Sequence, residues 1–189
     1  MNEIVALLFQ AHHLKRVKRT GYEFLGMGNE SVAEHSYHTV FIAYALSKLV
    51  PEADALRLLA MCLFHDLTEA RIGDLNYVQK KYVTPDESKA LADTISGVPF
   101  GRDMAAIIEE FNAQETLEAR LSHDADQLSF IMDLKMLSDL GYKPPKEWLP
   151  NVRGRLKTQV GIQLSDSICK TNHDQWWRKI FVDSENEKE

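Results

Sequence analysis

The stretch Leu63-Phe64-His65-Asp66-Leu67-Thr68-Glu69-Ala70 places an imidazole and a carboxylate side by side in an otherwise apolar run. The residues from 53 to 70 are mostly apolar, and they predict one helix that is buried on nearly all sides. Glu69 follows His65 by four positions and Asp66 by three, so one helical face would carry all three side chains. An ionised carboxylate is costly to bury unless it is paired, and a divalent cation is the strongest partner available. The alternative is that His65 and Asp66 hydrogen-bond to each other and fill a niche in the core.

Composition and charge are those of an ordinary globular protein. The chain has 189 residues, of which 44% are hydrophobic and 26% are charged, and this favours a single domain with a substantial core. We expect this domain over residues 1–182 and a disordered acidic tail over residues 183–189. The net charge of −6 argues against a nucleic-acid polymer as partner. A small anionic substrate remains compatible, because a local basic cluster or a metal ion can outweigh the overall charge.

Cysteine content and hydropathy indicate the compartment. The two cysteines, Cys62 and Cys169, do not indicate a disulfide framework. No apolar run approaches the roughly 20 residues of a membrane span, and the first residues do not resemble a secretory signal. We therefore expect a cytoplasmic protein without a membrane segment.

Apolar periodicity predicts helices throughout the chain and no strands, which makes the fold an all-α helical bundle. The expected helices cover residues 2–17, 31–49, 53–70, 102–113, 116–140, 146–163 and 165–180, with a further one opened by Pro85-Asp86-Glu87. Ser31-Val32-Ala33-Glu34 is a capping box, so His35 would lie in the first turn of its helix and could point off the helix end. Trp148, Trp176 and Trp177 are expected to anchor the packing of the last helices.

A basic segment precedes this helix. Lys15, Arg16, Lys18 and Arg19 are four basic residues in five, followed by a turn at Gly21. They fit a solvated helix end favoured by the helix dipole, or an anion clamp in which Arg19, next to the turn, reaches inward.

The order of these motifs resembles a known family. His35, then His65-Asp66 thirty positions later, then Asp126, in an all-helical chain of this size, resemble the HD-domain metal-dependent phosphohydrolases. Four segments look like the branch that contains bacterial 5'-deoxynucleotidases and their eukaryotic HD-domain relatives, and the resemblance covers roughly residues 5–142. These segments are Leu14 to Gly21, Glu30 to Ser36, His65 to Asp74 and Asp124 to Leu128.

The resemblance implies a metal centre and a division of roles. The residues that would coordinate one divalent ion are His35, His65, Asp66 and Asp126. Two imidazoles and two carboxylates suit Mn, Co, Fe, Ni or Zn better than Ca. Mg is a further candidate for the ion. The ion would lower the pKa of its bound water and neutralise charge on the phosphate. Glu69 would accept or donate the proton of the attacking water or of the leaving group. Arg19 would bind phosphate oxygens, and Asp74 would orient water or sugar.

Two positions depart from the pattern. Periodicity alone places Asp124 among the apolar positions of its helix, whereas the Ala125-Asp126-Gln127-Leu128 context favours Asp126, so Asp124 stays as the alternative ligand. The deoxynucleotidases have a Trp just after the phosphate-binding Arg and use it to screen the sugar. Here Thr20, Gly21 and Tyr22 follow Arg19, so sugar selection through Tyr22 is a hypothesis.

The expected activity is a 5'-nucleotidase that releases phosphate from nucleoside 5'-monophosphates, with a preference for deoxynucleotides. Hydrolysis of nucleoside triphosphates or cyclic nucleotides at the same metal centre is the alternative enzyme. A noncatalytic helical module that senses a nucleotide or contacts another protein is the alternative from another class, although the presence of Glu69 and Asp74 argues against it. The resemblance also implies a homodimer.

Overall fold

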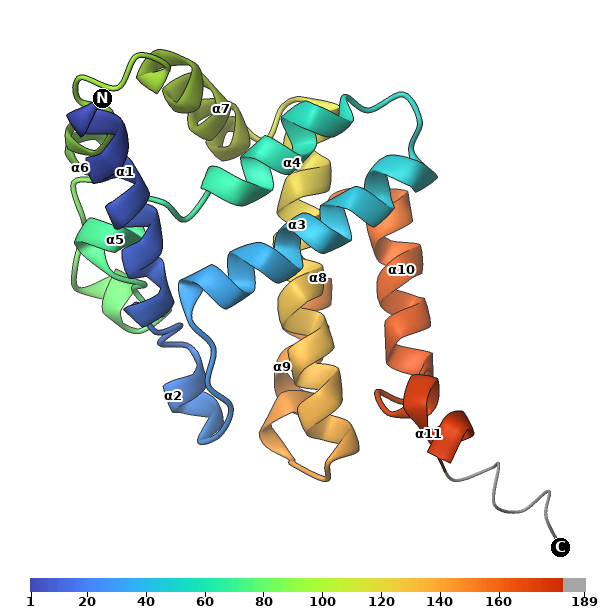
Figure 1. Ribbon diagram of the computed structural model, residues 1–189. Helices are drawn as coiled ribbons and strands as arrows, with labels where there is room; N and C mark the ends of the chain where they lie inside the picture. The colour runs from blue at the N-terminus through green and yellow to red at the C-terminus, as the bar shows by residue number, and fades with distance from the viewer. Residues whose placement is uncertain (182–189) are drawn as a thin grey trace, which may run out of the picture.

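The computed structural model describes residues 1–181 as a bundle of helices (Figure 1). Within these residues there is no β-strand, only one isolated antiparallel bridge between Lys18 and Ser31, so the predicted all-α class is confirmed. The α-helices are α1 (Asn2–His13), α2 (Tyr22–Leu25), α3 (Val32–Leu49), α4 (Ala55–Phe64), α5 (Glu69–Ile72), α6 (Glu87–Ile95), α7 (Gly101–Ala113), α8 (Leu117–Asp139), α9 (Pro144–Arg153), α10 (Gln159–Lys170) and α11 (Gln175–Phe181). Short 3-10 helices cover Leu14–Arg16 and Gln79–Lys81.

Three helices form the centre of the bundle. The 23-residue helix α8 runs through the middle of the molecule, and α3 and α4 pack against it and against each other (Figure 1). Leu46, Leu58 and Leu128, one from each of these helices, are completely buried. Each buried leucine contributes about 1.5–3 kcal/mol of hydrophobic stabilisation, so this core fixes how α3, α4 and α8 are placed relative to one another.

The capping box of α3 forms as predicted. The Ser31 hydroxyl accepts a hydrogen bond from the Glu34 amide at 3.2 Å. The Glu34 carboxylate in turn accepts from the Ser31 amide at 2.7 Å. Two amide groups at the helix start are thereby satisfied, and His35 is held in the first turn.

The single helix expected over residues 53–70 is wrong, because it is two helices. α4 ends at Phe64 and α5 begins at Glu69. Between them Leu67 N–H donates to Phe64 O at 3.0 Å and Glu69 N–H donates to Asp66 O at 3.0 Å, which are the tighter bonds of a turn rather than of an α-helix. Glu69 therefore does not share an uninterrupted helical face with His65 and Asp66.

Burial of α4 also differs from the prediction. Leu56 is 80% exposed and Leu63 is 54% exposed, whereas Leu58, Met61 and Cys62 are completely buried. The helix is thus amphipathic and contributes one face to the core.

The boundaries near the carboxyl end are shifted as well. The helix predicted over 146–163 is α9 followed by the start of α10, with a break from 154 to 158, and the helix predicted over 165–180 spans parts of α10 and α11. Trp148 packs edge-on against Phe130, with ring centroids 6.1 Å apart, as an anchor would. Trp176 is 78% exposed, and Trp177 is 37% exposed, so Trp176 is not an anchor.

The predictions for the two ends of the chain have different outcomes. The first helix ends at His13 and passes into the 3-10 turn Leu14–Arg16 instead of continuing to residue 17. The acidic tail over residues 183–189 lies outside the described residues. None of the helices described is long and apolar enough to cross a membrane.

Candidate metal centre

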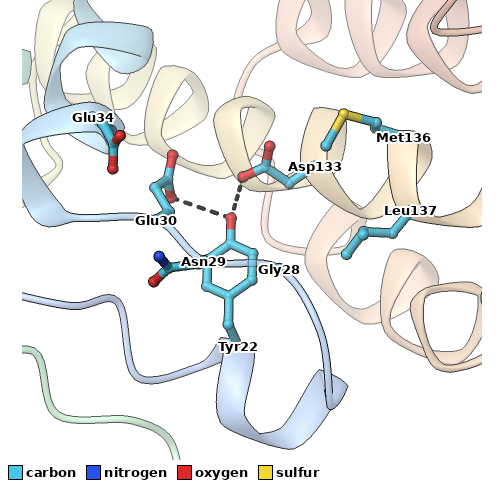
Figure 2. Close-up of a pocket in the computed structure, with 8 residues that line it drawn as sticks. All are labelled: Tyr22, Gly28, Asn29, Glu30, Glu34, Asp133, Met136 and Leu137. Atoms are coloured by element: carbon cyan, nitrogen blue, oxygen red, sulfur yellow. Dashed lines mark hydrogen bonds between the residues drawn. The ribbon is translucent and has the colours of Figure 1, made fainter.

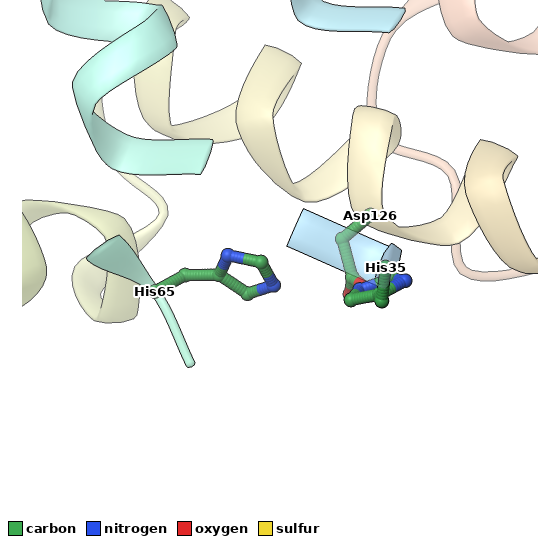
Figure 3. Close-up of side chains that lie close together, drawn as sticks. All are labelled: His35, His65 and Asp126. Atoms are coloured by element: carbon green, nitrogen blue, oxygen red, sulfur yellow. The ribbon is translucent and has the colours of Figure 1, made fainter. Parts of the chain in front are cut away.

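His35, His65 and Asp126 come together from the three central helices (Figure 3). One ligand atom from each lies within 4.8 Å of the others, and His35 Nε2 is 2.9 Å from Asp126 Oδ1. His35 lies in the first turn of α3, His65 directly follows α4, and Asp126 lies within α8. Because the core fixes these helices relative to one another, it also fixes the separation of the three side chains.

Asp66 joins this cluster from its position next to His65. Its Oδ2 atom is 3.1 Å from His65 Nε2 and 3.9 Å from His35 Nε2. The same oxygen accepts a hydrogen bond from Arg19 Nη1 at 3.3 Å. The turn between α4 and α5 thus places Asp66 between the two imidazoles and a guanidinium.

The structure brings Asp126 into the cluster and directs Asp124 elsewhere. Asp124 is completely buried and accepts hydrogen bonds from the Lys157 amide at 2.6 Å, the Thr158 amide at 2.9 Å and the Thr158 hydroxyl at 2.5 Å. A Cβ atom on Gly161 would lie 2.3 Å from Asp124 Oδ2, so this close approach requires glycine. Asp124 therefore holds the segment that leads into α10.

The residues present fit a divalent ion. His65 Nδ1 lies 2.9 Å from the Cys62 carbonyl oxygen, which favours a proton on Nδ1 and leaves the Nε2 lone pair free for a ligand bond. Within the described residues the buried His65 Nε2 makes no well-aligned hydrogen bond, and its polar neighbour is the proposed ligand Asp66, with Oδ2 at 3.1 Å. Two imidazoles with adjacent carboxylates form a donor set that divalent transition metals prefer.

The charges of the cluster also favour a cation. Burial opposes ionisation of both Asp66 and Asp126, but the neighbouring His65, His35 and Arg19 hold the pKa of each carboxyl below its usual range. Burial likewise disfavours charge on His65, yet Asp66 and Asp126 raise the pKa of that ring to about 9. The carboxylates are thus ionised and close together, and a bound cation would offset their mutual repulsion.

Arg19 is the member of the basic segment that points inward. Its side chain is 18% exposed and contacts Asp66, whereas Lys15, Arg16 and Lys18 are exposed. Asp74 holds the adjacent turn, because its Oδ2 accepts from the Thr20 amide at 2.5 Å and its carbonyl oxygen accepts from the Thr20 hydroxyl at 2.9 Å. Asp74 thereby fixes the backbone next to Arg19.

Glu69 contributes a buried carboxyl group at the edge of the cluster. Its Oε2 atom is buried and makes no hydrogen bond among the described residues. Burial, and then the charges of Asp66 and Asp74, raise the pKa of Glu69 to about 9. At neutral pH this carboxyl is protonated in the metal-free protein and can donate a proton.

Tyr22 lies at a neighbouring cavity of about 220 Å³. Its hydroxyl is 3.2 Å from Glu30 Oε2 and forms a short hydrogen bond with Asp133 (Figure 2). The ring packs against Gly28, which has φ +82°, and a Cβ atom there would lie 2.5 Å from the ring. The remaining residues that line the cavity are Asn29, Glu34, Met136 and Leu137.

Sequence reasoning gave no role to Glu30 or Asp133. The available signals were the position of Glu30 directly before the capping box and an acidic residue, Asp133, in a mostly apolar helix. Neither signal identifies a partner. Tyr22 and Asp133 are 111 residues apart in the sequence, and the contact between Tyr22 and Glu30 depends on the turn that separates them.

Comparison with known proteins identifies the class to which this fold and this cluster belong. The chain belongs to the HD-domain family, whose model, described as "HD domain", matches residues 11–166. It is 27% identical to the human protein named 5'-deoxynucleotidase HDDC2 over 163 residues, covering 82% of this chain and 79% of that protein. The Dictyostelium discoideum protein of the same name is 31% identical over 134 residues, covering 63% of this chain and 69% of that protein.

Solved structures agree with this assignment. A conserved hypothetical protein from Pyrococcus furiosus superposes with a TM-score of 0.75 at 29% sequence identity, over 88% of this chain and 99% of that one. The predicted HD-type helical bundle is therefore confirmed.

Proposed function

We propose that this protein is a metal-dependent 5'-nucleotidase that releases phosphate from deoxynucleoside 5'-monophosphates. The observation that carries the proposal is the convergence of His35, His65 and Asp126 within 4.8 Å, with Asp66 between the imidazoles and Arg19. The relatives named 5'-deoxynucleotidase, at 26–31% identity, support the choice of substrate.

The four proposed ligands hold one divalent ion, which is Mn, Co, Fe, Ni, Zn or Mg. His35 and His65 supply imidazole nitrogens, and Asp66 and Asp126 supply carboxylate oxygens. When bound, such an ion lowers the pKa of a water molecule and neutralises charge on the phosphate.

Arg19 is proposed to hold the phosphate. Its guanidinium has five N–H donors in a planar fork that matches phosphate oxygens, and Asp66 engages Nη1 at 3.3 Å. The hydrogen bonds from Thr20 to Asp74 keep the backbone of this segment in place, so Asp74 supports the clamp in addition to orienting water or sugar. Glu69 is proposed to transfer a proton to the leaving oxygen, because burial and the neighbouring carboxylates raise the pKa of its carboxyl and so favour the protonated form.

Tyr22 is proposed to influence the choice of sugar. It lines the cavity next to Glu30, and Glu30 Oε2 lies 3.9 Å from Arg19 Nε. We expect the sugar of a nucleotide whose phosphate lies on Arg19 to approach this cavity, where the Tyr22 ring would limit the space.

The experiment that tests the proposal is product analysis with a substrate panel. Metal-loaded protein is given ribonucleoside and deoxynucleoside 5'-monophosphates, the corresponding triphosphates and cyclic nucleotides, and each product is identified by chromatography. The proposal expects inorganic phosphate and a nucleoside from the 5'-monophosphates. Cleavage restricted to triphosphates or cyclic nucleotides would assign the alternative enzyme, and binding without any cleavage would assign the sensing module.

Assembly and location belong to the same proposal. Tyr37, Phe41 and Tyr44 are 72%, 63% and 53% exposed, and their spacing places them along one outer face of α3. A second copy of the chain packed on this aromatic face would form a homodimer. The proposed cytoplasmic location is supported by Cys62 and Cys169, which are both free thiols.

A further inference from the structure

Glu30 lies where the metal centre and the phosphate clamp meet. Its carboxylate is only 13% exposed, and Oε2 is 3.8 Å from His35 Nδ1 and 3.9 Å from Arg19 Nε. The Glu30 carbonyl oxygen also accepts a hydrogen bond from the Arg19 amide at 2.9 Å. One residue thus contacts both a proposed metal ligand and the proposed phosphate-binding group.

The His35 ring needs an acceptor on the side where Glu30 lies. An imidazole that binds a metal through Nε2 carries its proton on Nδ1, and an acceptor at Nδ1 fixes this tautomer and the ring orientation. His65 has such an acceptor in the Cys62 carbonyl oxygen, at 2.9 Å. His35 Nδ1 is buried and makes no hydrogen bond within residues 1–181, and the Glu30 carboxylate faces it.

The same Glu30 oxygen that faces His35 is also held by Tyr22, whose hydroxyl lies 3.2 Å from Oε2. The Tyr22 hydroxyl connects the carboxylates of Glu30 and Asp133 (Figure 2). Asp133 lies on α8, seven residues after Asp126 and therefore about two helical turns along the same helix. The network Asp133–Tyr22–Glu30 thus connects α8 to the start of α3 on the opposite side of His35 from Asp126.

We propose that Glu30 is a positioning residue that accepts the Nδ1 proton of His35 and faces Arg19 Nε, so that the imidazole is oriented for a divalent ion and the guanidinium for phosphate. A small rotation of the Glu30 side chain shortens the 3.8 Å separation to a hydrogen bond of roughly 2.7–2.9 Å. This inference rests on the proposed function for its ion and its phosphate, but the tautomer of His35 can be measured without either.

The test compares Glu30→Ala and Glu30→Gln with Glu34→Gln as the matched control. Glu34 is the same residue type and lines the same cavity, but its carboxylate bonds to Ser31 and does not face His35. Two quantities are measured on each protein. Nitrogen-15 NMR of the metal-free protein reports which ring nitrogen of His35 is protonated, and titration calorimetry with Mn²⁺ reports the dissociation constant.

In the metal-free wild-type protein, the Nδ1 tautomer of His35 that Glu30 favours competes with the Nε2 tautomer, which donates to Asp126 Oδ1 at 2.9 Å. A mixture of the two tautomers is therefore expected. Glu30→Ala should lower the fraction of the Nδ1 tautomer and weaken Mn²⁺ binding by about 10–100-fold, the usual effect of removing such a partner. Glu30→Gln keeps an acceptor oxygen and should recover much of the Nδ1 tautomer, while Glu34→Gln should stay within about twofold of wild type in Mn²⁺ affinity.

An unchanged tautomer and unchanged affinity in Glu30→Ala would overturn the inference, as would an equal loss of affinity in Glu34→Gln. If the wild-type protein binds no Mn²⁺ and cleaves no nucleotide, the proposed function fails instead. The tautomer measurement then still decides whether Glu30 orients His35.

Discussion

Asp124 and Asp126 lie two residues apart on α8, and their carboxylates contact different parts of the molecule. Asp124 accepts three hydrogen bonds from Lys157 and Thr158, while Asp126 faces His35 at 2.9 Å. We expect Asp124→Ala to lower the free energy of unfolding by about 1–3 kcal/mol, because buried donors lose their acceptor, with ion affinity retained in the folded fraction. Asp126→Ala should instead abolish ion binding. Chemical denaturation and calorimetry of both variants measure the two effects, and loss of ion binding in Asp124→Ala alone would reverse the assignment.

Sequence could indicate the candidate ligands, but periodicity alone pointed to Asp124, and the preference for Asp126 came from the resemblance of its motif. His35, His65 and Asp66 stand out because ligand-type side chains in apolar helices need partners. The periodicity of α8 correctly selects Asp124 as the more buried position. Asp124 is buried because its carboxylate binds the segment directly before α10. Asp124 serves as a hydrogen-bond acceptor for Lys157 and Thr158, which lie more than thirty residues further along the chain. Helical periodicity does not reveal such a contact.

Glu69 is expected to reduce the stability of the metal-free protein while it serves the reaction. A carboxyl whose folded pKa is raised to about 9 binds its proton more tightly in the folded than in the unfolded chain. Stability therefore falls as the pH rises from the unfolded pKa of about 4.3 toward 9. We expect chelator-treated Glu69→Gln to melt a few degrees above wild type at pH 8, with the difference disappearing near pH 4.

The same Glu69→Gln variant should lose about 10²–10⁴-fold in the rate of phosphate release, because the amide cannot transfer a proton. Thermal melts across this pH range and a phosphate assay measure both effects. A variant that is active, or that melts below wild type at pH 8, would contradict this role.

At the scale of elements, the start of α3 matters most because its first turn carries His35. Ser31→Ala removes the hydroxyl that accepts from the Glu34 amide and should cost about 1 kcal/mol. This corresponds to a fall of about 2–4 °C in melting temperature for a chain of this size. Ser31→Thr retains the acceptor and serves as the control, and equal melting temperatures for the alanine and threonine variants would show that the cap contributes nothing.

Helix starts were easier to predict than helix ends. Ser31, Asp86 and Thr116 each accept a hydrogen bond at the start of a helix, a local pattern that sequence alone reveals. The break between α4 and α5 was missed because no Gly or Pro marks residues 65–68, and the apolar pattern of α4 runs directly up to them. Its Asp66 pairs with Arg19, 47 residues away, and such tertiary contacts override local preference.

At the scale of the whole molecule, the assembly is the least constrained property. If the aromatic face of α3 pairs two copies, light scattering should give a mass of twice 21.6 kDa. Phe41→Glu would place a carboxylate in that interface and should shift the protein to a monomer. Tyr82→Glu, at a position 84% exposed outside α3, is the matched control. A wild-type protein of single-chain mass would contradict the homodimer.

The architecture as a whole was predictable in class and in the order of its motifs, since helical periodicity and ligand spacing are sequence properties. The relative placement of α3, α4 and α8 was not predictable from the sequence, because it results from packing in the core. It is this packing that brings ligand-type atoms of three side chains distant in the sequence within 4.8 Å of one another.

The most direct test of the central claim is phosphate release from a deoxynucleoside 5'-monophosphate by protein that has been stripped of metal and then reloaded with Mn²⁺. We expect no phosphate release from the stripped wild type, recovery of release on addition of the ion, and no recovery for Asp66→Ala at any ion concentration. Equal release by stripped and reloaded protein, or by Asp66→Ala, would contradict a metal-centred nucleotidase.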